Sequence, residues 1–230
     1  MKLATNIKTR ELISKWPLLS SKTDNVKKAI TMERSNSDDS SSTSSLPQRN
    51  LEFLELIGRL KHLKRTGWVL RKVQDPEAVA GHMYRMAVMS FLIESDSNID
   101  RKKCMELAIV HDMAECIVGD ITPICGISPA EKRRQEEAAM GQLVKLIGNN
   151  SEYVNNLFQE YEQQETTEAK LVKEFDRLDM IIQAFEYEKL EGKQSAGRLE
   201  EFFVSTEGKF STPFVKAIVE ELKKQRAALS

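Results

Sequence analysis

The sequence predicts an all-α protein with an N-terminal extension that does not fold with the rest of the chain. Apolar residues recur at three- and four-residue spacings through almost everything after Asn50, which is the period of a helix with one buried face. Several of these segments begin with an N-cap residue followed by proline or glutamate. Only the short stretch 68–73 has weak strand character.

The first 49 residues differ in composition from the remainder. Residues 35–45 read S-N-S-D-D-S-S-S-T-S-S, a segment too polar to bury enough apolar area to offset its ordering entropy. We therefore expect a disordered or weakly helical extension over 1–49 and a folded domain over 50–230. The basic start of the extension faintly resembles an organelle transit peptide but lacks its arginine-rich amphipathic pattern, so the cytoplasm is the default expectation and organelle targeting stays open.

Composition limits the classes of partner. Lys and Arg number 34 against 35 Asp and Glu, so the chain has no net field that would attract nucleic acid or an anionic membrane. No apolar run approaches the roughly 18 residues that a membrane span needs. The three cysteines form no C-x-x-C pair, which favours reduced thiols in an intracellular protein.

Two helices are expected before residue 100. The first covers about 51–60, where leucine and isoleucine form one apolar stripe. The D-P-E sequence at 75–77 is typical of a helix start, with an acceptor at the N-cap and proline in the first turn. The helix that it opens carries His82 and extends to about residue 92.

Five further helices follow, joined by short loops. A central helix is expected over 101–118 and is closed by Gly119, because glycine commonly ends a helix. Ser128 and Pro129 open the next helix through a capping box with proline at its first position. The other segments with helical period are 151–163, 166–190 and 212–229. The loop 119–128 contains two glycines and one proline and should be structured.

The central helix carries polar groups among apolar residues. It reads L-A-I-V-H-D-M-A-E-C-I-V-G-D over 107–120, so Glu115 lies one helical turn after both His111 and Asp112. Burying such groups costs several kcal/mol unless a partner or a metal compensates for the lost solvation. The alternative, a surface helix with a polar stripe, is less suitable because apolar residues surround the polar ones.

Other apolar helices supply similar side chains. His82 lies in the preceding apolar helix, and Asp176 and Asp179 lie in the long helix at 166–190. Imidazole and carboxylate suit Mn, Co, Fe, Mg or Zn, and the absence of thiolates argues against a structural zinc site. The pattern predicts a metal centre built from three helices.

These motifs resemble one known family. They are E-A-V-A-G-H-M-Y-R-M-A at 77–87, H-D-M-A-E-C-I-V-G-D-I at 111–121, E-K-R-R-Q-E-E-A at 131–138, E-A-K-L-V-K-E-F-D-R-L-D-M at 168–180 and S-T-E-G-K-F at 205–210. Together they resemble the HD-domain metal-dependent phosphohydrolases, in the branch of the 5'-deoxynucleotidases. The resemblance extends from about residue 51 to the C-terminus and implies an HD-domain helical bundle.

The resemblance also implies a set of metal-binding residues. They are His82, His111, Asp112 and Asp176, with Glu115, Asp120 and the main chain at Ile121 as further parts of the site, suited to a second cation. One position departs from the family pattern, because Gly81 stands where an acidic residue usually precedes the first histidine. Any supporting role of that carboxylate is therefore missing here.

Catalytic roles follow from this set. Glu115 is expected to orient or deprotonate the attacking water, and Asp120 to bind a second ion or the sugar hydroxyls. Arg65 and Arg85 are candidates for the substrate phosphate, since a guanidinium matches it in a bidentate way. Each arginine could instead belong to a structural ion pair.

One aromatic residue and one acidic residue complete the expected site. Trp68 either stacks on the base or belongs to the core. Asp179, one turn beyond Asp176, is expected to support a ligand and not to bind metal itself.

The predicted function is hydrolysis of deoxyribonucleoside 5'-monophosphates by a homodimer that uses Mn, Co or Mg, with one or two ions per chain. A second reading is hydrolysis of guanosine tetraphosphate or a cyclic dinucleotide; the absence of a Gly-Tyr-Pro motif counts against the latter. A third reading is a non-catalytic nucleotide-binding module, against which the complete ligand set argues.

Overall fold

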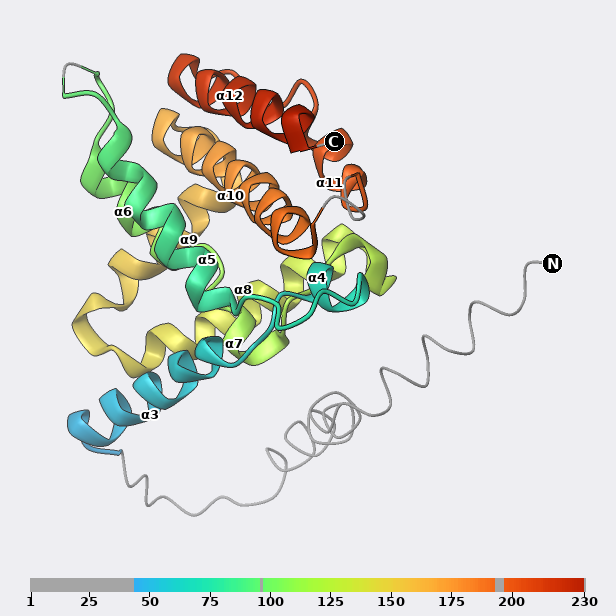
Figure 1. The fold of residues 1–230 in the computed structure, drawn as a ribbon. Coiled ribbons are helices and arrows are strands. Elements are labelled where there is room, and N and C mark those ends of the chain that lie inside the picture. Colours follow the sequence, from blue (N-terminus) through green and yellow to red (C-terminus); the bar gives the residue numbers. More distant parts are fainter. Residues whose placement is uncertain (1–43, 96, 193–196, 230) are drawn as a thin grey trace. The chain divides into compact units, whose positions relative to one another are not determined.

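The computed structural model describes residues 44–95, 97–192 and 197–229, and these residues form a bundle of helices (Figure 1). They contain no β-strand, only one isolated antiparallel bridge between Lys64 and Ala78. The expected extension falls mostly on residues 1–43, which lie outside the described part. None of the described helices combines the length and the apolar character that crossing a bilayer would need.

The main helices agree closely with the periods in the sequence. Their bounds are α3 Leu46–Gly58, α4 Thr66–Leu70, α5 Val79–Met89, α6 Arg101–Val110, α7 Glu115–Val118, α8 Pro129–Leu146, α9 Ser151–Gln163, α10 Thr167–Glu191, α11 Glu200–Thr206 and α12 Pro213–Leu229. The side chain of Ser128 accepts a hydrogen bond from the backbone N–H of Glu131, as an N-cap residue does. Thr166 caps α10 in the same way through the N–H of Ala169.

Two local features before residue 80 differ from the sequence pattern. The stretch 68–73 is not a strand, because α4 occupies its first half. The helix that was expected to start at 75–77 begins at Val79, because Asp75 adopts a left-handed φ of 46°. The backbone carbonyl of Glu77 accepts a hydrogen bond from the Arg65 N–H at 3.0 Å. This bond to a distant residue holds the segment in an extended conformation, and local helix propensity does not take it into account.

The central helix is also not continuous. α6 ends at Val110, and the chain passes through a tight turn before α7 begins at Glu115. In this turn the N–H groups bond across three residues, from Met113 to Val110 and from Glu115 to Asp112. Gly119 closes α7 with a φ of 82°, as predicted.

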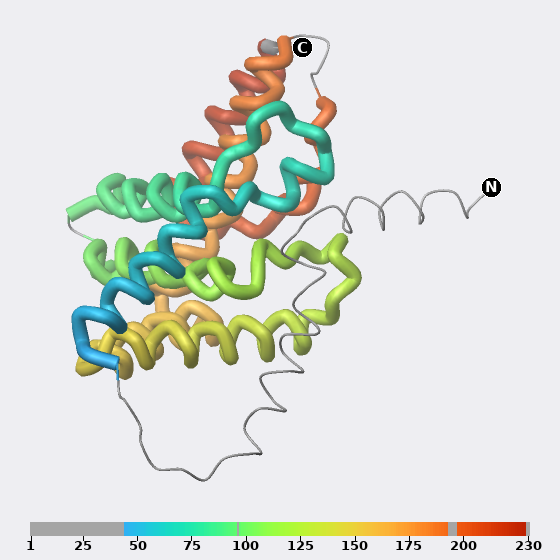
Figure 2. The backbone as a smooth tube through the Cα atoms, turned by 90° about the horizontal axis from the view of Figure 1, so that it is seen from below, coloured from blue at the N-terminus to red at the C-terminus, as the bar shows by residue number. Residues whose placement is uncertain are grey.

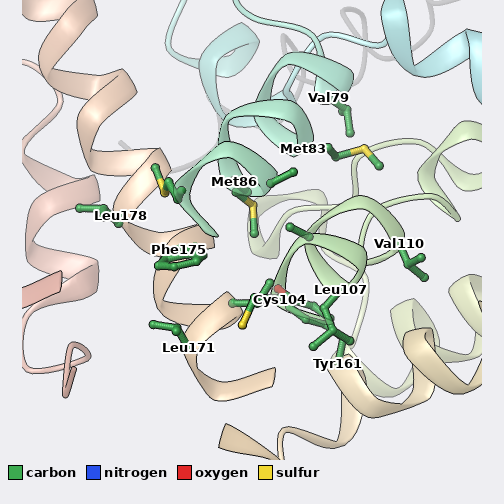
Figure 3. Packing of buried hydrophobic residues seen from close by; sticks show 14 of the residues in the cluster. Val79, Met83, Met86, Cys104, Leu107, Val110, Tyr161, Leu171, Phe175 and Leu178 are labelled. Atoms are coloured by element: carbon green, nitrogen blue, oxygen red, sulfur yellow. The ribbon is translucent and has the colours of Figure 1, made fainter. Parts of the chain in front are cut away.

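The core lies where α5, α6 and α10 pack against one another. Met86 of α5, Leu107 of α6 and Phe175 of α10 are completely buried, and Figure 3 shows them in one apolar cluster. α9 packs against α6 and α10, and α8 packs against α3, α7 and α9 (Figure 2). Because three helices share this core, polar residues on their inner faces lie close together.

A buried carboxylate attaches the last helix to the core. Glu174 of α10 is buried, and its oxygens accept hydrogen bonds from the backbone N–H groups of Ser211 and Thr212 at 2.9 and 3.1 Å. These groups immediately precede α12, where the helix leaves its first N–H groups without internal partners. Glu174 therefore caps α12 from another helix.

We expect Glu174→Ala to lower the free energy of unfolding by about 2–3 kcal/mol, because several charge-assisted hydrogen bonds are lost and their donors stay partly buried. Chemical denaturation measures this change. The matched control is Glu55→Ala, which removes an exposed glutamate of α3 and should leave stability nearly unaltered. Equal stability of both variants would contradict the capping role.

Candidate metal centre

Side chains from three elements meet at one buried point. His82 lies in the middle of α5, His111 begins the turn after α6, and Asp176 lies in the middle of α10. One ligand atom of each lies within 4.8 Å of the others. Both histidines are buried, so the polar cluster sits inside the apolar core and not on its surface.

Asp112 joins this group from the same turn. Its Oδ2 lies 3.0 Å from Nε2 of His111 and 3.7 Å from Nε2 of His82. Nε2 of His82 also lies 3.4 Å from Oδ1 of Asp176. Two imidazole nitrogens and two carboxylate oxygens thus face one another, the set that the sequence indicated for a metal.

The buried polar atoms fit a divalent cation. Among the described residues, four buried side-chain polar atoms have no hydrogen-bond partner, and three of these are Nε2 of His82, Nε2 of His111 and Oε2 of Glu115. A buried polar atom without a partner costs about 1–3 kcal/mol. A donor set of two imidazoles and two carboxylates suits Mn, Fe, Co or Zn and admits Mg. These residues therefore fit a metal.

The other ring nitrogens have partners that turn Nε2 inward. Nδ1 of His111 lies 2.8 Å from the carbonyl oxygen of Ala108, and Nδ1 of His82 lies 2.6 Å from Oδ2 of Asp179. Both partners are acceptors, which assigns the proton to Nδ1 in the neutral ring. Each Nε2 then carries a lone pair directed at the cluster.

Asp176 has one oxygen for the cluster and one for the protein. Its Oδ2 accepts hydrogen bonds from Nζ of Lys173 at 2.8 Å and from the hydroxyl of Tyr161 at 3.3 Å. The Tyr161 ring also packs on His111, with 5.0 Å between ring centroids. Sequence reasoning missed both partners; Lys173 was detectable one turn before Asp176, whereas Tyr161 comes from α9 and has no local signal.

The charges of the cluster stabilise one another. Burial alone would raise the pKa of Asp176, but Lys173 and His82 lower it well below its usual value. Burial and Arg65 lower the pKa of His82, yet Asp176 and Asp179 outweigh them and raise it to about 9, so a metal would have to displace a proton from the ring before Nε2 could bind it. The carboxylate of Asp176 is consequently ionised at neutral pH.

Glu115 has the opposite electrostatic environment. It is the first residue of α7 and only 4% exposed. Burial raises its pKa well above the usual value, and the charges of Asp112 and Asp120 raise it further, while Arg65 and Lys132 lower it. A raised pKa makes the Glu115 carboxylate a stronger base than an exposed glutamate, which suits a group that exchanges a proton with a water molecule.

Asp120 connects the loop after α7 to the start of α4. Its Oδ2 accepts the backbone N–H of Thr66 at 2.7 Å, and its carbonyl accepts the Thr66 hydroxyl at 2.8 Å. Ile121 follows it and is buried. This connection fixes the residue just before α4, which is Arg65.

Arg65 faces the candidate ligands. Nη1 lies 3.5 Å from Oδ2 of Asp112 and Nε lies 3.9 Å from Oε1 of Glu77, with the side chain largely buried. Burial lowers the pKa of Arg65, but Asp112, Asp176 and neighbouring acids raise it above its ordinary value. The guanidinium is a permanent positive charge beside the cluster.

Two residues predicted for the substrate are placed differently. Trp68 is 1% exposed, packs against Tyr187 and Phe202, and donates its indole N–H to Glu77 at 3.0 Å. Its faces are covered by core residues, so it presents no free ring to a base. The guanidinium of Arg85 donates hydrogen bonds to Asp179, Gln183 and Glu186 of α10, so its donors are already engaged.

Relatives of this chain are well represented among known proteins. The chain is 52% identical to "5'-deoxynucleotidase HDDC2" of Danio rerio over 77% of its own length and 88% of that protein. It is 50% identical to the human protein of the same name, over 77% and 86% of the two lengths. A solved structure of a conserved hypothetical protein from Pyrococcus furiosus is 34% identical, covers 76% of this chain and 99% of its own, and superimposes with a TM-score of 0.61.

A family model agrees with these relatives. The model described as "HD domain" matches residues 57–218, a span that includes His82, the His111–Asp112 pair and Asp176. It also covers the three helices whose packing brings those side chains together. This chain belongs to the HD domain family.

Proposed function

We propose that this protein is a metal-dependent 5'-deoxynucleotidase, which hydrolyses deoxyribonucleoside 5'-monophosphates to deoxyribonucleosides and phosphate. The observation that carries the proposal is a buried set of two imidazoles and two carboxylates, in which the Nε2 atoms face the carboxylates but have no hydrogen-bond partner among the described residues. Relatives about half identical over most of the chain bear the name of this activity, which favours it over another phosphorylated nucleotide or a non-catalytic module.

The proposed ligands are His82, His111, Asp112 and Asp176. A bound divalent cation, Mn, Co or Mg, would lower the pKa of a water molecule and polarise a phosphoryl oxygen. Phosphomonoester hydrolysis depends mostly on positioning and charge neutralisation, so the protein groups around the phosphate decide its rate.

Glu115 is the proposed proton acceptor. Its pKa is raised above that of an exposed glutamate, so its carboxylate is a stronger base. A stronger base is better suited to remove a proton from the attacking water. As the water oxygen bonds to phosphorus, the bond from phosphorus to the 5' oxygen breaks and that oxygen takes up a proton. Arg65 is proposed to bind the phosphate, because its guanidinium already lies beside Asp112.

Asp120 is proposed to have two roles, one for each oxygen of its carboxylate. Through Oδ2 it holds Thr66 and so keeps Arg65 at the cluster. Its second oxygen, with Glu115 and the carbonyl of Ile121, is proposed to reach a second cation or the sugar hydroxyls.

A homodimer in the cytoplasm completes the proposal. Tyr84, Val88 and Phe91 are 72%, 40% and 68% exposed, and their spacing places them on one face of α5 and the turn after it. A large exposed apolar stripe typically marks an interface. No disulfide joins the three cysteines, all of which lie within the described residues, and this suits a reducing compartment.

We expect wild-type protein to release phosphate from dAMP, dGMP, dCMP or dTMP when Mn, Co or Mg is added to the metal-stripped chain. Glu115→Gln should reduce this rate about 100-fold or more, because proton transfer is lost. Glu55→Gln, on the exposed face of α3, should be unaffected. Wild-type rates in Glu115→Gln, or no release by wild type with any metal, would contradict the mechanism.

Metal binding should stabilise the fold, because a ligand that binds only the native state raises the unfolding temperature. Adding Mn to metal-stripped wild type is expected to raise the midpoint of thermal unfolding, and His111→Ala should abolish this shift. His62→Ala removes the third histidine, which is exposed, and should keep it. A full shift in His111→Ala would exclude this residue as a ligand.

The proposed interface is tested by Phe91→Arg. A charge within the apolar stripe should convert a dimer into a monomer in sedimentation equilibrium, since a buried unpaired charge is strongly unfavourable. Val204→Arg, at an exposed apolar residue of α11, is the control. A monomeric wild type, or a dimeric Phe91→Arg, would refute this interface.

A further inference from the structure

Asp179 is the most deeply buried acid next to the metal cluster. It lies one turn after Asp176 on α10 and has no exposed surface. Its Oδ2 is 2.6 Å from Nδ1 of His82, on the side of the ring opposite Nε2. A buried carboxylate needs a compensating partner, because its desolvation otherwise costs several kcal/mol.

That partner is Arg85, which lies one turn after His82 on α5. Its Nε donates to Oδ1 of Asp179. Its Nη2 donates to Gln183 at 2.8 Å and its Nη1 donates to Glu186 at 2.9 Å. All three acceptors follow one another along α10, so every nitrogen of the guanidinium is held by the same helix.

We infer that Arg85 and Asp179 are a positioning pair for His82: Arg85 holds Asp179 in place, Asp179 holds the imidazole ring, and Arg85 does not bind the substrate phosphate. This inference rests on the proposed metal site. The chain of contacts runs from α10 to α5 and back, and thereby sets both the position of the ring and the direction of its Nε2.

The physical reason is the orientation of a ligand by its second nitrogen. A carboxylate that accepts the Nδ1 proton of a histidine fixes the ring and makes Nε2 a stronger donor to a metal. A phosphate-binding role would require Arg85 to leave three partners on α10. Arg65, by contrast, has only separations of 3.5 and 3.9 Å to its acidic neighbours.

The test compares metal affinity with substrate affinity. Mn binding to the metal-stripped full chain is measured by calorimetry, and the KM for dAMP is measured at saturating Mn. Asp179→Asn should weaken Mn binding about 10- to 100-fold, and Arg85→Gln should weaken it about tenfold, the lower end for such outer contacts. The KM of Arg85→Gln should stay within about twofold of wild type.

Arg133→Gln is the matched control, since it breaks only a surface ion pair with Glu137 on α8. Circular dichroism of the metal-free variants establishes whether they fold. If Asp179→Asn does not fold, Arg85→Gln carries the test. A KM for dAMP raised tenfold in Arg85→Gln with unaltered Mn affinity would overturn the inference and assign Arg85 to the phosphate. Unaltered Mn affinity in a folded Asp179→Asn would overturn it as well.

The two proposals fail differently. Wild type that binds Mn but hydrolyses no deoxynucleotide contradicts the proposed function, while the affinities of the variants for Mn still decide the positioning role. Wild type that binds no Mn contradicts the metal site and the positioning role together.

Discussion

Two imidazole rings buried in an apolar core are the constraint on which this structure depends. His82 and His111 each bond outward through Nδ1, to Asp179 and to the carbonyl of Ala108, and each directs Nε2 inward, where it has no hydrogen-bond partner among the described residues. Such an arrangement is unfavourable in a purely apolar core, because unpaired polar atoms lose their hydration. The ion pairs around it offset part of that cost, and a metal ion, which the donor set fits, would offset more of it.

The backbone is shaped by this cluster. A continuous helix from α6 into α7 would satisfy local propensity, yet the chain tightens into a turn at His111 and Asp112. A tighter turn of this kind inside a helical stretch often marks a functional segment or a sequence under strain. Here the turn lets Asp112 lie against both histidines while Glu115 begins a new helix.

A second layer of contacts supports the first. Tyr161 and Lys173 bind the outer oxygen of Asp176, and Asp120 holds Thr66, the neighbour of Arg65. In the proposed site, α5, α6 and α10 would supply the metal ligands, and Arg65, just before α4, would bind the phosphate. The span that the HD domain model matches contains both groups of residues.

The sequence by itself determined the helical class, most helix bounds and the family, because these depend on local period, caps and motifs such as Ser128-Pro129 and His111-Asp112. Only the tertiary structure decided that the central helix breaks and that Trp68 lies in the core. It also decided that Arg85 binds Asp179, a contact between residues 94 positions apart. A local pattern can identify an arginine on the same helical face as a ligand. It cannot say which acidic group of another helix pairs with that arginine. Packing settles that question, because it brings distant charges within reach and leaves each with a limited number of partners.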